Sequence, residues 1–378
     1  MNKIEELISK LCPNGVEYKK LGDITTISRG RILTKSQLSS NGKYPVYHGG
    51  IEPLGFYDKP NRSGDTVMVI NVGASAGTVG YSPTEFWASS GRFCIEHNGL
   101  INNKYLYYCL SNVQNALQSK VRKAGIPTLN KSVLENTIIP LPPLEVQEEI
   151  VKILNNFTEL TSELTSELIS RRKQYEYYRD KLLTFGDGVE YKKLGDIGEV
   201  SMCKRILKSQ TNAVGGIPFY KIGTFGKEPD AFISTEMFEE YKSCYSFPKK
   251  GDVLISASGT IGKTVIYDGK PAYYQDSNIV WIDNNEDVVL NKYLYYVYQL
   301  SPWRISTGGT IARLYNDNIA NAKIPVPSLE EQARIVDILD RFDKLCNNFS
   351  EGLPAEIEAR QKQYEYYRDK LLTFKEMS

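Results

Sequence analysis

Few residues of this chain are arranged as catalytic groups usually are. The segment ASGTIGKT, from Ala257 to Thr264, is close to a phosphate-binding loop. However, Ala257 stands where that loop needs glycine, and the strand-like TVIYDG follows where it needs a helix. Leu141 to Leu144 read LPPL and lack the amide and the aromatic residue that hold a flipped adenine in a methyltransferase. With two histidines and no CxxC pair among six cysteines, zinc-finger and HExxH sites are excluded, and the thiols should be reduced and buried. We therefore expect no catalytic residue, no metal and no cofactor in this chain.

Basic, aromatic and polar residues instead gather in two stretches at corresponding positions. SRGRILTKSQL spans 28–38 and SMCKRILKSQT spans 201–211, and each is followed by a turn that carries tyrosine, YPVYHGG at 44–50 and IPFYKIG at 217–223. Lys and Arg can contact the phosphates or base edges of nucleic acids, and hydroxyl groups can add base contacts. Any single residue of this kind is more often solvated surface, so the inference rests on the matched positions of the two clusters. The candidate DNA contacts are Arg29, Arg31, Lys35, Tyr47, His48 and Arg92 in the first half, and Lys204, Arg205, Lys208, Lys221, Ser258, Thr260 and Lys263 in the second.

The overall charge neither announces nor excludes a polyanion partner. The formal net charge is +1 for 378 residues, but residues 16–140 hold fourteen Lys and Arg against eight Asp and Glu, while 189–325 are nearly neutral. A surface for nucleic acid must therefore be built from local clusters. No stretch approaches the length of a membrane span, and the N-terminus MNKIEELISKLC lacks the apolar run of a signal peptide, so we expect a cytoplasmic protein.

The chain is an internal repeat with a circular order. Each half has an entry segment, a variable segment, a proline-rich exit and a long charged helix. KLLTFGDGVEYKKL at 181–194 resembles LISKLCPNGVEYKKL at 7–21, so the pattern of the C-terminal KLLTF is continued by the protein's own N-terminus. The repeated segments are GVEYKKLGDI at 15–24 and 188–197, NKYLYY at 103–108 and 291–296, and KQYEYYRDKLLTF at 173–185 and 362–374.

Both charged segments carry the apolar heptad pattern of a coiled coil. The first contains the tandem FTEL-TSEL-TSEL at 157–168, and the second is interrupted at Gly352–Pro354, where four extra residues shift the heptad. On the apolar seam, tyrosines indicate helix packing and protein docking rather than base stacking. The predicted packing and docking residues are Leu154, Leu164, Leu168, Tyr175, Tyr178, Leu182, Leu339, Phe342, Tyr364, Tyr367 and Leu371.

These patterns predict an α+β protein with two mixed α/β globular domains. Two long antiparallel coiled-coil helices should separate the domains, and the whole should have circular pseudo-two-fold symmetry. The predicted segments are 1–14 (N-terminal helical segment), 15–142 (first domain), 143–186 (first long helix), 187–327 (second domain) and 328–378 (second long helix).

At this point the sequence resembles the specificity (S) subunit of type I restriction-modification systems. The resemblance covers nearly the whole chain and rests on PLPPLEVQEEIVKIL, the TSEL tandem and RRKQYEYYRDKLLTF, with Ser328 in place of the second proline of the PLPPL motif. It implies a non-catalytic DNA reader whose two target recognition domains each read one half of an asymmetric, bipartite sequence. The helices would dock two methyltransferase subunits, which bring S-adenosylmethionine, and restriction subunits would bring ATP and magnesium.

Two other interpretations remain open at this stage. A scaffold that binds proteins and no DNA would fit the near-zero net charge, and an S-like subunit of a type IIB enzyme would share the same architecture. The domain content of the neighbouring genes separates the three.

Overall fold

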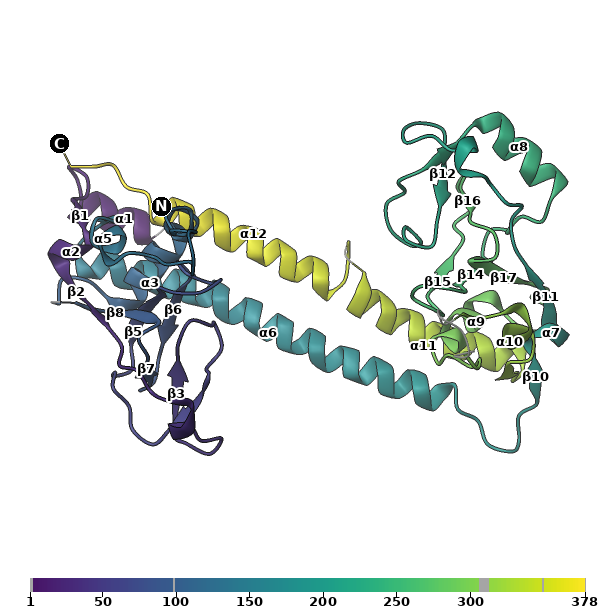
Figure 1. The fold of residues 1–378 in the computed structure, drawn as a ribbon, viewed down its shortest axis with the longest axis horizontal. Coiled ribbons are helices and arrows are strands. Elements are labelled where there is room, and N and C mark those ends of the chain that lie inside the picture. Colours follow the sequence, from purple (N-terminus) through teal and green to yellow (C-terminus); the bar gives the residue numbers. More distant parts are fainter. Residues whose placement is uncertain (1–2, 98, 306–312, 349, 378) are drawn as a thin grey trace. The chain divides into compact units, whose positions relative to one another are not determined.

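The chain divides into two compact units, each containing one globular domain and part of the long helices (Figure 1). The first unit is made of two segments, Met1–Thr165 and Glu356–Ser378, and the second is the continuous segment Ser166–Ala355. The C-terminal residues therefore belong to the same unit as the N-terminus. The computed structural model describes residues 3–97, 99–305, 313–348 and 350–377.

The first domain is built on an antiparallel sheet of order β2-β8-β5-β6, accompanied by a smaller sheet β4-β3-β7 and by the pair β1-β9. β5 reads TVMVI and is buried along its whole length, as expected for a central strand rich in β-branched residues. The N-cap Asn102 starts α3 by accepting hydrogen bonds from the backbone of Lys104 and Tyr105. The elements are α1 (Lys3–Leu11), β1 (Tyr18–Lys20), α2 (Leu21–Ile24), β2 (Thr25–Arg29), η1 (Lys35–Gln37), β3 (Tyr44–Tyr47), β4 (Gly55–Tyr57), β5 (Thr66–Ile70), β6 (Val79–Ser82), β7 (Trp87–Ala88), β8 (Arg92–His97), α3 (Asn103–Asn112), α4 (Gln114–Ser119), α5 (Lys131–Glu135) and β9 (Ile138–Pro140).

The second domain repeats this topology. Its sheets have the orders β11-β17-β14-β15, β13-β12-β16 and β10-β18, and the pair β12-β16 is parallel, as β3-β7 is in the first domain. An additional helix, α8, lies beside the smaller sheet. The elements are β10 (Tyr191–Lys193), α7 (Leu194–Ile197), β11 (Gly198–Ser201), η2 (Lys208–Gln210), β12 (Ile217–Tyr220), β13 (Phe232–Ile233), α8 (Thr235–Cys244), β14 (Val253–Ser256), β15 (Thr264–Ile266), β16 (Tyr273–Tyr274), β17 (Ile279–Asn284), α9 (Asn291–Tyr298), α10 (Asn316–Ala320) and β18 (Lys323–Pro325).

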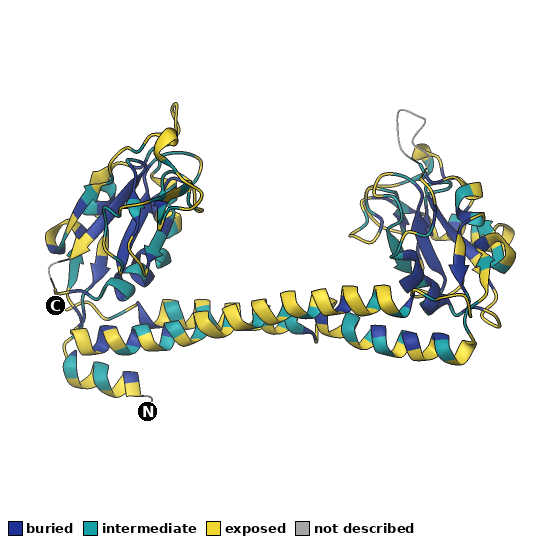
Figure 2. Ribbon diagram, turned by 90° about the horizontal axis from the view of Figure 1, so that it is seen from below, coloured by how far each residue is buried: buried dark blue, intermediate teal, exposed yellow. Residues whose placement is uncertain are grey.

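The long helices contribute to the cores of both units. In the first unit, Leu154 of α6 (Leu144–Leu182) and Leu371 of α12 (Leu353–Leu371) join one apolar cluster with the residues of α3. In the second unit, Tyr175 of α6 and Leu339 of α11 (Leu329–Asn347) join the cluster around α9. Figure 2 shows dark, buried patches on long helices whose remaining residues are half-buried or exposed. The domains are therefore packed onto the helices rather than tethered to them.

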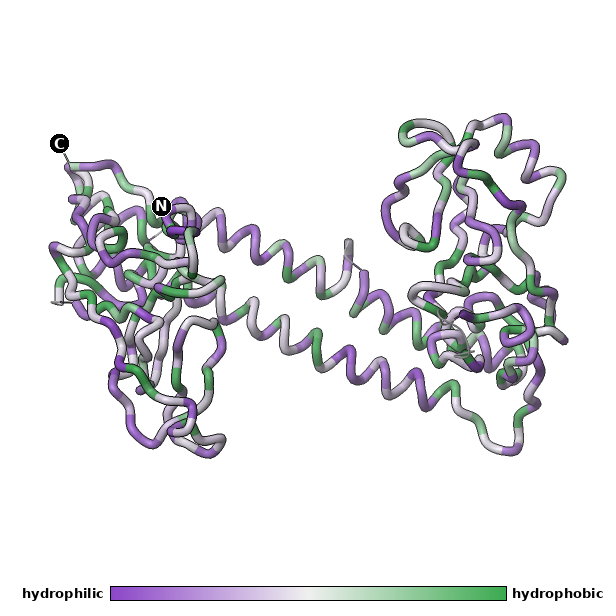
Figure 3. The backbone as a smooth tube through the Cα atoms, viewed as in Figure 1, coloured by the Kyte–Doolittle hydropathy of each residue, from purple (hydrophilic) through white to green (hydrophobic). Residues whose placement is uncertain are grey.

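Within each unit the helices pair through aromatic contacts. The Phe157 ring of α6 stacks on Tyr367 of α12 with 5.3 Å between the ring centroids. In the second unit, Tyr178 stacks on Phe342 at 5.7 Å, and the Arg172 guanidinium donates to the carbonyl oxygen of Cys346 at 3.5 Å. Since the residue number falls along α11 as it rises along α6, this pair is antiparallel. The hydropathy pattern alternates along the helices, as a packed seam requires (Figure 3).

The second long helical segment is two helices, α11 and α12, whereas α6 is continuous over 39 residues. At the break, the side chain of Asn348 accepts hydrogen bonds from the backbone of Ser350 at 2.7 Å and Glu351 at 3.2 Å. A Cβ at Gly352 would lie 2.5 Å from the carbonyl oxygen of Lys344, so the chain can pass there only as glycine. The interruption expected at Gly352–Pro354 is a complete helix end that lies slightly earlier, because α11 ends at Asn347 and α12 begins at Leu353, so that Pro354 is in its first turn.

The cysteines are free thiols, and all except Cys244 are buried. Burial raises the pKa of Cys109 and of Cys203 to about 12, so both are protonated and unreactive at neutral pH. Across the described residues, no three His, Cys, Asp or Glu side chains are placed to share a metal ion. In the same residues, no helix is both long and apolar enough to cross a membrane.

Candidate nucleic-acid interface

Three loops of the first domain meet at one end of its larger sheet. The turn after β5, residues 71–77, is called the β5 turn. It contacts the loop that contains Pro127, because the backbone N–H of Gly73 donates to the carbonyl oxygen of Pro127 at 2.9 Å. The loop after β3, residues 48–51 and called the β3 loop, packs closely on the same turn, because a Cβ on Gly49 would lie 2.6 Å from the oxygen of Val72. Glycine therefore allows the two backbones to approach.

The second domain brings the corresponding loops together. The turn after β14, residues 257–262, is called the β14 turn. The segment before α10 contacts it, because the backbone N–H of Leu314 donates to the carbonyl oxygen of Ala257 at 2.9 Å. In the loop after β12, residues 221–226 and called the β12 loop, the N–H of Ile222 donates to the Gln275 side chain at 3.0 Å. A Cβ on Gly259 of the β14 turn would lie 3.3 Å from the Ile222 side chain, so this loop and this turn also lie side by side.

Exposed cations lie near this surface in the first domain. The side chains of Arg31 and Lys35 are exposed, and the backbone N–H of Arg31 is fixed to the oxygen of Ala88 at 2.9 Å. Arg29 is also exposed, and its guanidinium lies 5.2 Å from the centre of the Phe93 ring. A fixed backbone that carries free cationic heads is suited to phosphate contact.

The second domain has matching cations. The side chains of Arg205 and Lys208 are exposed, while the Lys204 ammonium lies 4.9 Å from the centre of the Tyr245 ring. The carbonyl oxygen of Lys204 accepts from the hydroxyl of Tyr273 at 3.0 Å, which fixes the backbone at this point.

The same local fold places one lysine in each cluster. Lys35 and Lys208 begin the short 3-10 helices η1 and η2. In η1 the Gln37 side chain accepts a hydrogen bond from the backbone N–H of Thr34 at 3.0 Å. In η2 the Gln210 side chain accepts from the backbone N–H of Leu207 at 2.8 Å. The repeated KSQ letters therefore encode one repeated turn.

Several predicted contacts of the first domain are held inside it. His48 is half-buried, with its Nδ1 3.1 Å from the hydroxyl of Ser89, and Tyr47 is half-buried beneath Arg92. Arg92 itself is only 3% exposed. Its guanidinium lies over the Tyr47 ring at 4.9 Å and donates to the carbonyl oxygens of Gly50 and Ile51. Burial lowers the pKa of Arg92 to about 10, and it still remains charged at neutral pH.

The second domain also commits some predicted contacts internally. Lys221 forms an ion pair with Asp230 at 2.8 Å, and the Ser258 hydroxyl donates to the Asn278 side chain at 2.8 Å. Thr260 is exposed, and its carbonyl oxygen accepts from the hydroxyl of Ser256. Lys263 is half-buried, and its ammonium donates to the oxygen of Phe225 at 2.6 Å. The structure therefore separates exposed cations from cations that hold loops, a distinction that residue type alone does not make.

Basic residues beside these loops escaped the sequence reasoning. Arg122 and Lys123 are exposed next to Gly125, which has a φ of +79°, in the loop that leads to Pro127. The letters VRKAGIP, a basic pair before a glycine turn, could have indicated them. In the second domain, Arg313 donates to the oxygen of Ser277 at 2.8 Å and is placed beside the β14 turn by its neighbour Leu314.

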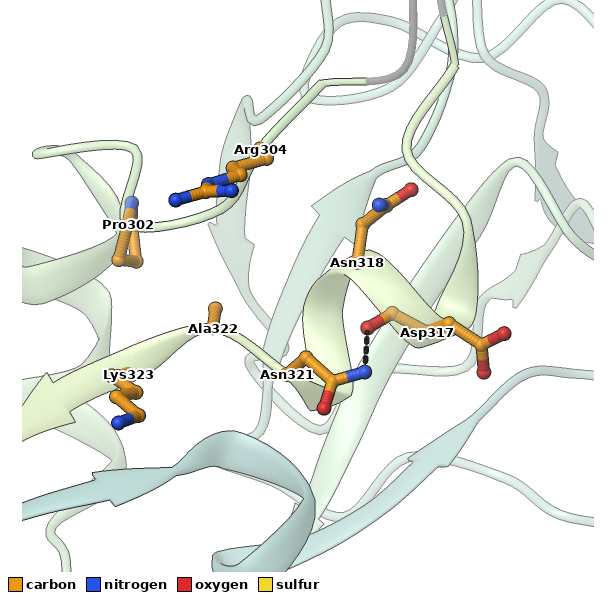
Figure 4. Close-up of a pocket in the computed structure, with 7 residues that line it drawn as sticks. All are labelled: Pro302, Arg304, Asp317, Asn318, Asn321, Ala322 and Lys323. Atoms are coloured by element: carbon orange, nitrogen blue, oxygen red, sulfur yellow. Dashed lines mark hydrogen bonds between the residues drawn. The ribbon is translucent and has the colours of Figure 1, made fainter.

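A polar cavity of about 560 Å³ opens at the end of α10 (Figure 4). The side chain of Asn321 donates to the carbonyl oxygen of Asp317 at 2.9 Å and shapes one wall. Two cations, Arg304 and Lys323, and one carboxylate, Asp317, line it. The cavity is lined by Pro302, Arg304, Asp317, Asn318, Asn321, Ala322 and Lys323.

The repeated helix segments present a second kind of surface. Tyr175 is buried and its hydroxyl donates to Gln299 at 2.8 Å, while Tyr178 and Tyr367 stay partly exposed on the aromatic seam. The most exposed tyrosines are Tyr177 at 61% and Tyr366 at 62%, which the heptad reasoning passed over because they lie off the seam. Of the other predicted packing residues, Leu154, Leu339 and Leu371 are buried, and Leu164, Leu168, Leu182, Phe342 and Tyr364 are half-buried.

The circular order is present in the hydrogen bonds. The hydroxyl of Tyr18 donates to the carbonyl oxygen of Phe374 at 3.1 Å, although the two residues lie at opposite ends of the chain. In the second unit the hydroxyl of Tyr191 donates to the oxygen of Phe185 at the same distance, within one continuous segment. The C-terminus therefore occupies, in the first unit, the position that the end of α6 occupies in the second.

Comparison with known proteins agrees with this geometry. The sequence profile of the family described as "Type I restriction modification DNA specificity domain" matches residues 13–171 and 186–359. A putative type I restriction enzyme specificity subunit of Haemophilus influenzae, S.HindORF215P, is 50% identical over 373 residues, which cover 95% of this chain and 96% of that relative. The EcoR124I/EcoR124II specificity subunit of Escherichia coli is 37% identical over 294 residues, 72% of this chain and 70% of the relative.

Solved structures share the fold. The crystal structure of a type I restriction-modification S subunit from M. genitalium superposes with a TM-score of 0.65 at 17% identity, covering 95% of this chain and 96% of the other. A structure described as the basis of complex assembly and conformational transition of the type I R-M system gives a TM-score of 0.59 at 21% identity, covering 95% and 98%. The predicted fold class is thereby confirmed.

Proposed function

Because the chain belongs to the family of type I restriction-modification DNA specificity subunits, we propose that it is the DNA-reading subunit of such a complex. Each globular domain reads one half of an asymmetric, bipartite DNA target, and the chain itself catalyses no reaction. One observation carries this proposal: the two domains share one sheet order, yet the residues at their corresponding loops differ. A common frame with different loops is what two readers of different half-sites require.

The loops and the exposed cations have different tasks in this proposal. Arg31 and Lys35 in one domain and Arg205 and Lys208 in the other contact phosphates, which gives affinity without sequence information. Residues of the β3 loop, the β12 loop and the β14 turn face base edges. Hydrogen bonds to base edges distinguish base pairs in the major groove, so these loops supply the specificity.

The repeated tyrosine segments dock the catalytic subunits. Tyr177 and Tyr366 stand at the same position of two identical thirteen-residue segments and are equally exposed, so they suit two copies of one partner. The partners are two methyltransferase subunits, which bring S-adenosylmethionine, together with restriction subunits that bring ATP and magnesium. The complex works in the cytoplasm, where it meets chromosomal and incoming DNA.

A methyl-transfer assay tests this assignment. The purified chain, a methyltransferase subunit of the same system, and the two together are incubated with DNA and labelled S-adenosylmethionine. We expect transfer only when both are present, and only to DNA that contains the target. Reproducible transfer by this chain alone contradicts a non-catalytic subunit, and transfer without sequence preference contradicts a reader.

Two double variants test the DNA surface. Arg31→Ala with Lys35→Ala, and Arg205→Ala with Lys208→Ala, should each weaken DNA binding by the complex and reduce the salt slope of the binding constant by about two units. Both half-sites should stay the same because no base contact is lost. Lys131→Ala is the control, since Lys131 forms an ion pair with Glu135 on α5. An unchanged salt slope would show that the cluster does not contact DNA.

A further inference from the structure

Each domain holds one loop with a cation, buried Arg92 in the first domain and half-buried Lys263 in the second, and the two cations come from different parts of the sheet. In the first domain, Arg92 at the start of β8 donates to Gly50 and Ile51 of the β3 loop. In the second domain, Lys263 donates to Phe225 and Gly226 of the β12 loop, at 2.6 and 3.5 Å. In both cases the acceptors are backbone carbonyl oxygens.

The two cations occupy different positions of the same frame. Arg92 pairs with Ile70 across the sheet, and the equivalent pair in the second domain is Ile279 with Ser256. The equivalence is set by the turns, because Gly77 donates to Ile70 just as Gly262 donates to Ser256. An isoleucine of the second domain therefore stands where the first domain has its arginine.

The reverse exchange occurs at the end of the turn. The backbone N–H of Ser256 donates to the carbonyl oxygen of Lys263 at 2.9 Å. In the first domain, the backbone N–H of Ile70 donates in the same way to Thr78 at 2.9 Å. Thr78 of the first domain thus corresponds to Lys263 of the second. Each domain carries its loop-holding cation at the position where the other has a neutral side chain.

Neither cation is explained by charge pairing. No described carboxylate lies within ion-pair distance of Arg92 or Lys263, and the Nε of Arg92 has no hydrogen-bond partner. Burying the Arg92 guanidinium without a counter-charge is costly, and an apolar side chain of similar size is usually at least as good for stability. The bonds to the loop carbonyls are what these cations supply.

The local backbone fits this role. Gly226 has a φ of +67°, and a Cβ there would lie 2.8 Å from the Lys263 ammonium, so glycine lets the ammonium reach the loop. In the first domain, the carbonyl oxygens that Arg92 binds belong to Gly50 and Ile51. Both residues are exposed, and Ile51 is exposed by 64%. An exposed loop with few apolar contacts keeps a single shape only if its backbone is held.

We propose that Arg92 and Lys263 are positioning residues for half-site reading: each fixes the loop that one domain presents to base edges, without contacting DNA itself. This rests on the proposed function. Removing the charge should leave the phosphate contacts in place and release the loop. The base preference of one half-site should then relax, while the other half-site keeps its preference.

The test is methylation by the reconstituted complex on a DNA library in which both half-sites are randomised. Lys263→Met keeps the length of the side chain and removes the donor. We expect relaxed preference at one or more positions of one half-site, by about tenfold per position, with an unchanged salt slope and an unchanged second half-site. Lys263→Arg should restore the preference, and Lys270→Met, which removes an exposed lysine of the same domain, should change nothing.

Arg92→Met should relax the other half-site, with Arg92→Lys as its conservative partner. The intact half-site serves as the internal check for folding, because a complex that has lost a domain methylates no bipartite target. If Lys263→Met keeps both half-sites, or lowers the salt slope as a lost phosphate contact would, the positioning role is wrong. If the wild-type complex shows no sequence preference, the proposed function fails instead, so the two failures can be told apart.

Discussion

Each domain has a base, where it packs on the long helices, and an outer lobe, which contains the smaller sheet, and the two differ in how far they are repeated. At the base, the hydroxyl of Tyr105 donates to Pro140 at 3.2 Å, and in the second domain Tyr293 donates to Pro325 at 3.1 Å. In the outer lobes, the small cluster around Phe86 contains four buried residues among those described. The corresponding cluster of the second domain contains fourteen, with Phe238 of α8 among them. Contacts are repeated where the domains meet the helices and are replaced where they face away from them.

This difference separates two demands on the chain. Docking of one kind of partner twice requires the same geometry twice, so the contacts at the helices cannot diverge. Reading two different half-sites requires different loops, so the outer lobes must diverge. Even the means of holding the loops has changed, from Arg92 in one domain to Lys263 in the other. A perturbation at the base should therefore act alike in both units, and one in the lobes should act on one unit only.

The largest effect is expected from the buried glutamines at the base. The Gln147 side chain accepts from the N–H of Asn102 at 2.8 Å and donates to Leu100 and Pro142. Gln332 repeats these bonds to Leu290, Val288 and Pro327. Gln147→Leu and Gln332→Leu each remove three hydrogen bonds that a fully buried side chain makes to the backbone, so each should lower the free energy of unfolding of its unit by about 3 kcal/mol.

Urea unfolding with hydrogen exchange measures this loss unit by unit. Gln361→Leu is the control, because this glutamine is exposed on α12 and should cost less than about 0.5 kcal/mol. A large loss in one unit and none in the other would break the idea of a shared base.

A smaller and unequal effect is expected at the circular joint. The Tyr18 hydroxyl both donates to and accepts from the backbone of Phe374, at 3.1 Å each. These bonds hold the segment after α12 against β1, to which no short covalent connection joins it. Tyr191 makes the corresponding bond to Phe185, which lies six residues earlier in the same continuous segment. Tyr18→Phe should cost about 1 kcal/mol and speed amide exchange at residues 372–377, whereas Tyr191→Phe should cost less. Equal exchange in the two variants would contradict the difference between a closed and an open joint.

The smallest energetic effect is expected from the TSEL tandem, which should change distance rather than affinity. Inserting TSEL after Leu168 adds four residues to α6, lengthening a helix by ~6 Å and turning it by ~40°. One DNA base pair rises ~3.4 Å and turns ~35°. Because a domain must keep facing its groove, rotation should decide, and the spacer between the half-sites should grow by one base pair. Mapped methylation sites with an unchanged spacer, or with altered half-site bases, would show that the length of α6 does not set the spacer.

The sequence carried the architecture because its repeats are nearly exact. KQYEYYRDKLLTF, GVEYKKLGDI and NKYLYY place the base contacts of both domains, and a heptad pattern predicts α6 along its length. Ser328 is explained by the structure, since it caps α11 by accepting from the N–H of Glu331 at 3.3 Å.

The candidate interface was predictable only in part. Arg31 and Arg92 are equivalent as letters, yet one is exposed and the other is buried, because burial depends on which strand meets which loop. Tyr177 lies off the heptad seam, so its exposure follows from the pattern, but the pattern does not distinguish a docking tyrosine from solvated surface. Tertiary contacts decide these roles, and a single sequence does not show them.

The central claim is that the two domains read two different half-sites through one common frame. Mapping every methylated adenine on DNA treated with the reconstituted wild-type complex tests it most directly. The account predicts one target made of two unlike half-sites separated by a spacer of fixed length and arbitrary sequence. A continuous target, two identical half-sites, or methylation without any shared sequence would contradict it.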